Sequence, residues 1–274
     1  MAESMLLAFS SRSIWMGDND NLPLPVEGLL SEEYLADRCA LLNTTARIEE
    51  RDVVPGDPRL HDPAFAVDTG SQVSTSEQQI AGIDTTHFTV MDADGNVVSW
   101  TSTIEGTWGS GITVPGYGFI LNNELTDFNS VPQANNSEED YAPGANDVAP
   151  FKRPRSSMAP TLVMKDGEFV AAYGSPGGST IINSVVNMTI NLIDHGMSVQ
   201  QAIDAPRISG GFGTVSYEEG FNEATLSAMR VLGHKLSDEP SVIGSVQAVT
   251  VESGSGVVSA GADSRRAGTV VGLP

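Results

Sequence analysis

The strongest constraint on the fold is an alternation of polar and apolar residues that starts near residue 85 and ends near residue 100. It is clear at residues 87–90, and it resumes at residues 97–100 after the tripeptide Asp94-Gly95-Asn96. A period of two is typical of a half-buried strand, and an Asp-Gly-Asn tripeptide between two such runs favours a tight turn. The stretch therefore predicts a β-hairpin that opens with the pair Thr85-Thr86. Such pairs are common at strand starts, where they only pack.

Apolar spacing and turn residues locate the other elements. The predicted helices cover residues 3–13, 31–42, 179–195, 199–204 and 223–232, and the further strands cover residues 119–121, 161–164, 169–173, 246–251 and 257–260. Strands, then helices, then strands again predict a layered structure of the α+β or α/β class.

Two stretches lack periodicity, and one predicted helix has a clear inner face. Residues 44–83 are rich in Pro, Gly and polar residues, which favours a linker, and residues 129–150 form a long polar loop. In the helix predicted for residues 31–42, we expect Leu35, Cys39 and Leu42 to point inward.

Composition excludes several classes of function. The 274 residues, 40% of them hydrophobic, suffice for one large domain or two small ones, and the formal net charge is −21. Such a chain should repel nucleic acid and anionic membranes. The single cysteine, Cys39, excludes an intramolecular disulfide and a cysteine metal site. We expect no metal, no cofactor, no membrane span and no signal peptide, because none of the corresponding patterns is present.

Four motifs occur in one order along the chain, at residues 84–92, 122–128, 152–158 and 174–179. With them, the sequence from about Met5 to its end resembles the γ-glutamyltranspeptidase family of N-terminal-nucleophile (Ntn) hydrolases. The resemblance implies an α+β fold of the four-layer αββα sandwich type, incomplete in this chain. It also implies that residues 1–84 correspond to the end of a large subunit with its linker, and residues 85–274 to a catalytic small subunit.

The resemblance implies that Thr85 is the nucleophile, exposed when the precursor cuts itself between Asp84 and Thr85. A free N-terminal threonine supplies both the attacking hydroxyl and, in its own amine, the base. A peptide-bonded nitrogen has no basic lone pair, so processing must precede activity. Thr86 is the rival nucleophile, but only Thr85 matches the family position.

Gly177 and Gly178 are the candidates for the oxyanion site. They lie between a predicted strand and a predicted helix, where backbone N–H groups can face a ligand without a Cβ in the way. A simple strand-to-helix turn would use the same two glycines. The family resemblance favours the oxyanion role.

The resemblance further implies a pocket for a γ-glutamyl group. Glu124 and Asp127 would hold its α-ammonium, and Ser156 and Ser157 would donate hydrogen bonds to its α-carboxylate. Taken alone, each of these residues is typical of solvated surface or a turn. The implied substrate-binding residues are Thr103, Glu105, Glu124, Asp127, Ser156 and Ser157.

Two departures from the family concern the substrate. Glu105 stands where many transpeptidases have Asn, which affects the acceptor or substrate preference. The arginine that binds the α-carboxylate in the family lies in a part of the large subunit that precedes this match. We therefore expect a large-subunit-like partner chain to complete the sandwich.

The expected function is γ-glutamyl transfer. A γ-glutamyl ester would form on Thr85 from glutathione or a related amide, and water or an amino acid would accept the acyl group. Two alternatives remain: a related amidohydrolase such as a cephalosporin (glutaryl) acylase, or a non-catalytic fragment that needs a partner chain. Family members in bacteria are often periplasmic or secreted.

Overall fold

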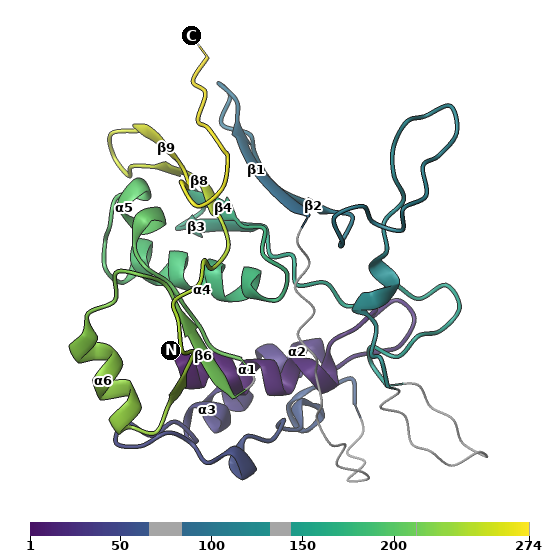
Figure 1. Ribbon diagram of the computed structural model, residues 1–274, viewed down its shortest axis with the longest axis vertical. Coiled ribbons are helices and arrows are strands. Elements are labelled where there is room, and N and C mark those ends of the chain that lie inside the picture. The colour runs from purple at the N-terminus through teal and green to yellow at the C-terminus, as the bar shows by residue number, and fades with distance from the viewer. Residues whose placement is uncertain (66–83, 132–143, 212, 274) are drawn as a thin grey trace.

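A computed structural model describes residues 1–65, 84–131, 144–211 and 213–273, and they form a mixed α and β structure (Figure 1). The predicted linker and the predicted polar loop therefore lie partly outside the described residues. None of the described helices is both long and apolar enough to span a bilayer.

Six α-helices and three short 3-10 helices are present in the described part. The α-helices are α1 (Ala2–Trp15), α2 (Val26–Leu30), α3 (Glu32–Cys39), α4 (Thr180–Ile193), α5 (Val199–Asp204) and α6 (Glu223–Val231), and the 3-10 helices are η1 (Glu50–Asp52), η2 (Pro58–His61) and η3 (Glu124–Asp127). All five predicted helices are confirmed. α2 was not predicted, because Pro23 and Pro25 indicated an extended segment there.

Nine strands form three sheets in the described residues. They are β1 (Thr85–Met91), β2 (Val97–Thr103), β3 (Thr161–Lys165), β4 (Glu168–Gly174), β5 (Ile208–Ser209), β6 (Thr214–Tyr217), β7 (Lys235–Leu236), β8 (Gln247–Val251) and β9 (Val258–Ala262). Their orders are β1-β2, β3-β4-β8-β9 and β5-β6-β7. Both predicted hairpins and both closing strands are confirmed. The sheet β5-β6-β7 was not predicted, because strands of two to four residues carry little periodic signal.

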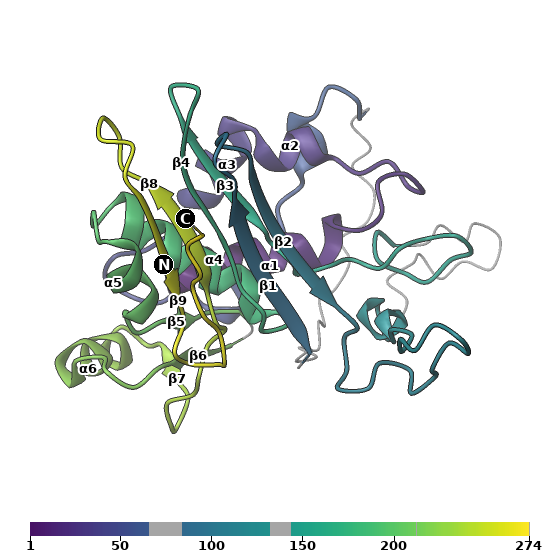
Figure 2. The same ribbon diagram turned by 90° about the horizontal axis from the view of Figure 1, so that it is seen from above.

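Three layers build the part of the molecule that positions the site (Figures 1 and 2). Helices α4 and α5 cover one face of the four-stranded sheet, and the hairpin β1-β2 lies against its other face, over β4 and β8. The helical side of the sheet holds the main core, because its side chains interdigitate with those of the two helices. This core consists of Ala171, Tyr173, Met188, Val199, Ala202, Ile203, Val246 and Ala248.

The two faces of the hairpin differ sharply in burial. Thr85 and His87 are buried against the four-stranded sheet, and Gly174 of β4 leaves room for the imidazole, since a Cβ there would lie 2.4 Å from the His87 ring. On the outer face, Phe88 stacks on its strand partner Trp100 with ring centroids 6.3 Å apart, and both are about half exposed. This outer face therefore carries apolar side chains that no described residue covers.

Two sequence predictions about burial and strands were wrong. Leu35, Cys39 and Leu42 are exposed, and Tyr34 is instead the buried residue of α3, with its hydroxyl 2.7 Å from Ser11 of α1. The face of α3 that carries Tyr34 packs against α1, because the tyrosine ring can be buried there while its hydroxyl makes this hydrogen bond. Residues 119–121 form no strand: Ile120 makes one isolated bridge to Thr113, and its apolar neighbours are exposed.

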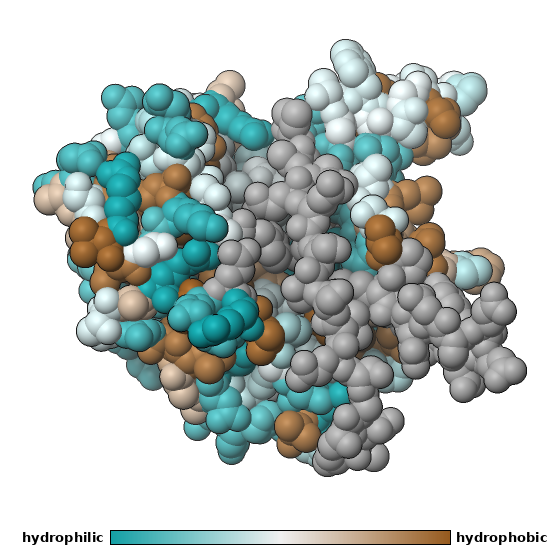
Figure 3. All heavy atoms as spheres, turned by 60° about the horizontal axis from the view of Figure 1, so that its bottom comes forward, coloured by the Kyte–Doolittle hydropathy of each residue, from teal (hydrophilic) through white to brown (hydrophobic). Residues whose placement is uncertain are grey.

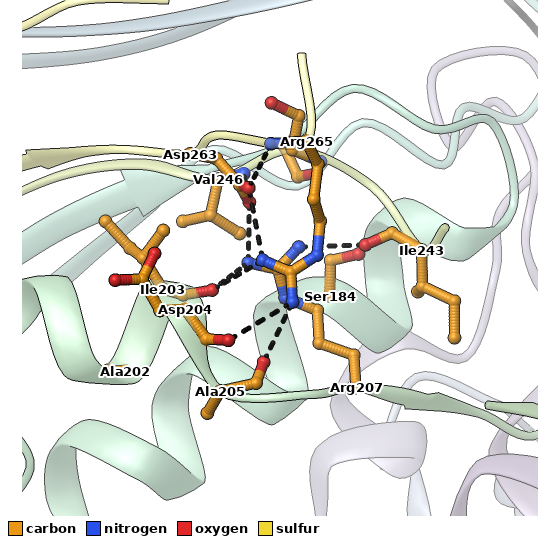
Figure 4. Close-up of polar contacts among 12 residues, drawn as sticks. Ser184, Ala202, Ile203, Asp204, Ala205, Arg207, Ile243, Val246, Asp263 and Arg265 are labelled. Carbon is orange, nitrogen blue, oxygen red and sulfur yellow. Dashed lines mark hydrogen bonds and ion pairs between the residues drawn. The ribbon is translucent and has the colours of Figure 1, made fainter. Parts of the chain in front are cut away.

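A buried cluster of charged groups ties the end of the chain to the loop after α5 (Figure 4). Arg207 and Asp263 have almost no exposed side-chain surface, and their Nη2 and Oδ2 atoms lie 2.7 Å apart. Arg265 joins them by donating to Asp263 Oδ1 at 3.1 Å and to Glu218 Oε2 at 2.6 Å. Burial alone would raise the pKa of Asp263, but the charge of Arg207 and backbone donors hold it below its usual value. The cluster is therefore ionised and well satisfied.

The face shown in Figure 3 is mixed in character. Apolar side chains lie in small groups among hydrophilic ones over its described part. This agrees with the high acidic content of the chain.

Candidate active site

Thr85 lies at the first position of β1, where it is buried, and its strand partner is Thr103 at the end of β2. The Thr85 hydroxyl donates to Thr103 Oγ1 at 3.1 Å. The hairpin register thus sets the two hydroxyls side by side. The family resemblance implies that Thr103 binds substrate, and the geometry also places its hydroxyl against the predicted nucleophile.

Thr103 also contacts the other side of the Asp84–Thr85 bond. Its hydroxyl points to the Asp84 carbonyl oxygen at 3.5 Å and accepts from the Glu105 backbone N–H at 2.9 Å. A threonine hydroxyl has one donor and two acceptor sites, so these contacts occupy all of its capacity. The Thr103 hydroxyl therefore connects the predicted nucleophile to the carbonyl that it would attack.

Three carboxyl groups gather beside this pair. Burial raises the pKa of Glu124 to about 7, and its hydrogen bond to Asp127 and the charges of Asp127 and Glu105 add to the effect. Burial also raises the pKa of Asp127, against the opposing charges of Arg12 and Arg155. The pKa of Glu105 is raised by burial and by Asp127.

Glu124 carries the clearest opening for a cation. Its Oε1 atom is buried and has no hydrogen-bond partner among the described residues. A buried acceptor without a partner is costly, so such atoms suggest a missing ligand. An ammonium group would satisfy this oxygen and lower the pKa values of both carboxyls.

Ser156 and Ser157 lie in an extended segment held by two arginines. Arg12 of α1 donates to Ser157 Oγ at 2.8 Å and approaches the Ser156 carbonyl oxygen at 3.4 Å. The buried Arg155 donates to the Arg12 carbonyl oxygen at 3.0 Å. The two serines thus lie beside positive charge, which suits a carboxylate ligand.

Gly177 and Gly178 follow β4 and lead into α4. Both have positive φ, 137° and 57°, which glycine adopts without a Cβ penalty. Their carbonyls accept from the Thr180 and Ile181 N–H groups at 3.1 Å, so they form the turn that precedes the helix. They lie just beyond Gly174, which contacts His87 on the strand of Thr85. No contact given by the structure joins either glycine directly to Thr85.

His87 is a packing residue on the buried face of β1. Its Nδ1 lies 2.8 Å from Thr101 Oγ1, its Nε2 lies 3.1 Å from Thr89 Oγ1, and burial lowers its pKa to about 4. The imidazole is therefore neutral at physiological pH.

Contacts and electrostatic effects connect Thr85, Thr103, Glu105, Glu124, Asp127, Ser156 and Ser157 into one site. Sequence reasoning missed Arg12 and Asn123. Arg12 lies on α1, far from the four motifs in the sequence. The only signal that could have identified it as a site residue is its charge among apolar neighbours. Asn123 lies within a motif, but an amide there looks like an ordinary turn residue. In the part of the chain that the structure describes, no group of His, Cys, Asp and Glu is suited to hold a metal ion.

Comparison with known proteins identifies the family of the chain. The family model described as Gamma-glutamyltranspeptidase matches residues 1–273. The chain belongs to the γ-glutamyltranspeptidase family. A glutathione hydrolase proenzyme from Bacillus subtilis strain 168 is 40% identical over 278 residues, which cover 100% of this chain and 44% of the relative.

Two further relatives bear on the substrate and on processing. Acylase ACY 1 proenzyme from Pseudomonas sp. strain SE83 is 33% identical and covers 91% of this chain and 39% of the relative. A structure of γ-glutamyltranspeptidase from Pseudomonas nitroreducens complexed with L-DON has a TM-score of 0.60 and 32% identity, and the match covers 69% of this chain and 100% of that one. This chain spans less than half of the length of the two curated relatives.

A ligand whose α-ammonium lies at the Glu124–Asp127 pair should bind in a pH-dependent way. In a Thr85→Ala background, the Kd of L-glutamate should rise about tenfold between pH 8 and pH 6, because a carboxyl with a pKa near 7 changes from mostly ionised to mostly protonated. Lowering the pH thus removes the charge that attracts the α-ammonium. Calorimetric titration at both pH values measures the effect.

The control for this prediction is a pair of substitutions. Glu124→Gln should flatten the pH dependence, whereas Glu219→Gln, at an exposed position, should leave it unchanged. An unchanged pH dependence in Glu124→Gln would assign the titration to another group.

Proposed function

We propose that this chain carries the catalytic centre of a γ-glutamyl transferase and glutathione hydrolase, with Thr85 as nucleophile after cleavage at Asp84–Thr85. The observation that carries the proposal is the half-buried Glu124–Asp127 pair, in which the buried Glu124 Oε1 has no partner among the described residues, in the same site as the hydroxyl pair Thr85–Thr103. A cation site next to a nucleophile fits an acyl donor that has an α-ammonium.

Cleavage precedes catalysis. The Thr85 hydroxyl oxygen attacks the Asp84 carbonyl carbon, the C–N bond breaks, and the hydroxyl proton passes to the released amine. The resulting ester between Asp84 and the Thr85 oxygen is hydrolysed by water, which restores the hydroxyl and leaves Asp84 as a new carboxylate. Thr103 supports both reacting groups through its contacts with the Thr85 hydroxyl and the Asp84 carbonyl.

In the catalytic cycle the freed Thr85 amine is the base and its hydroxyl attacks the γ-carbonyl of the substrate. The backbone N–H groups of Gly177 and Gly178 stabilise the oxyanion as the amide leaving group departs with the proton. Water or the amine of an amino acid then takes the γ-glutamyl group from Thr85.

The remaining site residues hold the donor. Glu124 and Asp127 bind the α-ammonium, and Ser156 and Ser157 bind the α-carboxylate. Arg12 adds positive charge to this carboxylate site, because its guanidinium already contacts Ser157. The carboxylate of Glu105 borders the donor pocket and influences the choice of acceptor.

Two findings support cleavage at this bond. The curated relatives are named proenzymes. The match to the complete P. nitroreducens chain covers 69% of this sequence, which equals the share of residues 85–274. The division into residues 1–84 and 85–274 follows from the same proposal.

The complete enzyme has the four-layer αββα sandwich, and a large-subunit-like partner supplies the remaining part of that sandwich. The hairpin β1-β2 leaves its outer face uncovered, with Val90 and Trp100 both 54% exposed. A face of this kind fits a further helical layer. The partner would also bring more positive charge to the donor carboxylate.

Two chromogenic anilides test the donor. We expect the processed chain, co-expressed with the upstream part of the B. subtilis relative, to prefer γ-glutamyl-p-nitroanilide over glutaryl-p-nitroanilide at least about tenfold in kcat/KM, because glutaryl lacks the α-ammonium. Release of p-nitroaniline is measured. Asp127→Asn should weaken use of the γ-glutamyl compound and spare the glutaryl one.

The rival functions give other results. A preference for glutaryl-p-nitroanilide would indicate an acylase, the function that the Pseudomonas sp. relative suggests. Processing without turnover of either anilide would indicate a non-catalytic role.

A further inference from the structure

Glu105 has a backbone conformation that its residue type disfavours. Among the described non-glycine residues, only Glu105, Phe151 and Asp166 have positive φ, at 71°, 62° and 53°. Phe151 and Asp166 are exposed, and Asp166 lies in the β3-β4 turn, whereas Glu105 is buried. A left-handed residue with a Cβ persists only where its surroundings hold it there, and such residues cluster at functional sites.

The main chain of Glu105 contacts Asp84 directly and Thr85 through the Thr103 hydroxyl. Its carbonyl oxygen accepts from the Asp84 N–H at 3.4 Å. Its N–H donates at 2.9 Å to Thr103 Oγ1, the atom that accepts from the Thr85 hydroxyl.

Asn123 holds the turn from the opposite side. Its N–H donates to the Ile104 carbonyl oxygen at 3.2 Å, and its side-chain oxygen accepts from the Gly106 N–H at 2.8 Å. The residues before and after Glu105 are thus both fixed by Asn123. Four hydrogen bonds therefore determine the conformation of a three-residue turn.

We propose that the left-handed backbone of Glu105 holds the Asp84–Thr85 peptide for its own cleavage. Glu105 is then a positioning residue for self-processing through its main chain, apart from any contact of its carboxylate with substrate. This role rests on the self-cleavage described under Proposed function: the Thr85 oxygen bonds to the Asp84 carbon, the C–N bond breaks, and the hydroxyl proton goes to the amine.

A substitution series at position 105 separates backbone from charge. Each full-length variant is refolded from urea, and the loss of uncut chain is followed by intact mass. Glu105→Gly, Glu105→Asn and Glu105→Gln should cleave within about threefold of wild type, because the first two favour positive φ and the third keeps the shape of Glu. Glu105→Val should cleave at least about tenfold more slowly, because a β-branched residue resists this conformation.

A second variant guards against misfolding of Glu105→Val, and far-UV circular dichroism in a Thr85→Ala background checks the fold of each variant. Asn123→Ala keeps the Glu105 residue but removes the acceptor of the Gly106 N–H and a side-chain hydrogen bond to the Glu105 carboxylate, and it should also slow cleavage. Equal rates in wild type, Glu105→Val and Asn123→Ala would overturn the positioning role alone. If Glu105→Gly, Glu105→Asn and Glu105→Gln all cleaved slowly, the carboxylate and not the backbone would be responsible, and the positioning role would again be overturned. A wild-type chain that never cleaves would overturn self-cleavage and, with it, this role.

Discussion

Thr85→Ala should leave the chain in one piece of 28.8 kDa, whereas the wild type should separate into residues 1–84 and 85–274. Alanine has no hydroxyl to attack the Asp84 carbonyl, and without cleavage the Thr85 amine stays in a peptide bond. Hydrolysis of γ-glutamyl-p-nitroanilide should fall at least ~1,000-fold, because nucleophile and base are lost together. Intact mass spectrometry and the anilide assay give the two readouts.

Thr86→Ala is the matched control. Thr86 is adjacent in sequence, but its side chain lies on the exposed side of β1, opposite to that of Thr85. The variant should therefore still cut between residues 84 and 85. If Thr85→Ala were still cleaved, or if only Thr86→Ala lost cleavage, Thr86 and not Thr85 would be the nucleophile. A wild type of undivided mass would mean that this chain alone keeps a blocked amine and should be inactive.

Asp263→Ala should lower the free energy of unfolding by about 3–5 kcal/mol, the range for removing one partner of a buried ion pair. The substitution leaves the guanidinium of Arg207 buried without its carboxylate, and Val246 N–H also loses its acceptor at 2.8 Å. Urea unfolding in a Thr85→Ala background, which prevents cleavage, measures the change.

An exposed ion pair provides the comparison. Arg230 and Glu223 of α6 lie 2.9 Å apart with 46% and 75% of their side chains exposed. Glu223→Ala should cost less than about 1 kcal/mol, because solvent screens the pair. If the two substitutions cost the same, the buried cluster would not hold the C-terminal strands in place.

Local sequence patterns were enough to predict most of the helices and strands of this protein. The two hairpins and the five predicted helices follow from side-chain period, turn residues and caps; the Ser31 side chain, for example, accepts from Tyr34 N–H as its position predicted. The motifs around Thr85, Glu124 and Ser157 likewise identified most of the candidate site, because each is contiguous in the chain.

Contacts between distant segments could only be read from the tertiary structure. Arg12 and Ser157 are 145 residues apart, so no local pattern joins them. Leu35 and Cys39 have the spacing of a buried face, yet burial depends on what packs there, and α1 packs against the face of Tyr34. The left-handed conformation of Glu105 is similar, because its residue type argues against it. Its own hydrogen bonds with Asp84 and Thr103, and those of Asn123 with Ile104 and Gly106, impose it. The sequence thus determined the elements and indicated the candidate nucleophile, Thr85. Tertiary packing decided which side chains surround that threonine, because burial and hydrogen bonding between remote segments outweigh local preference.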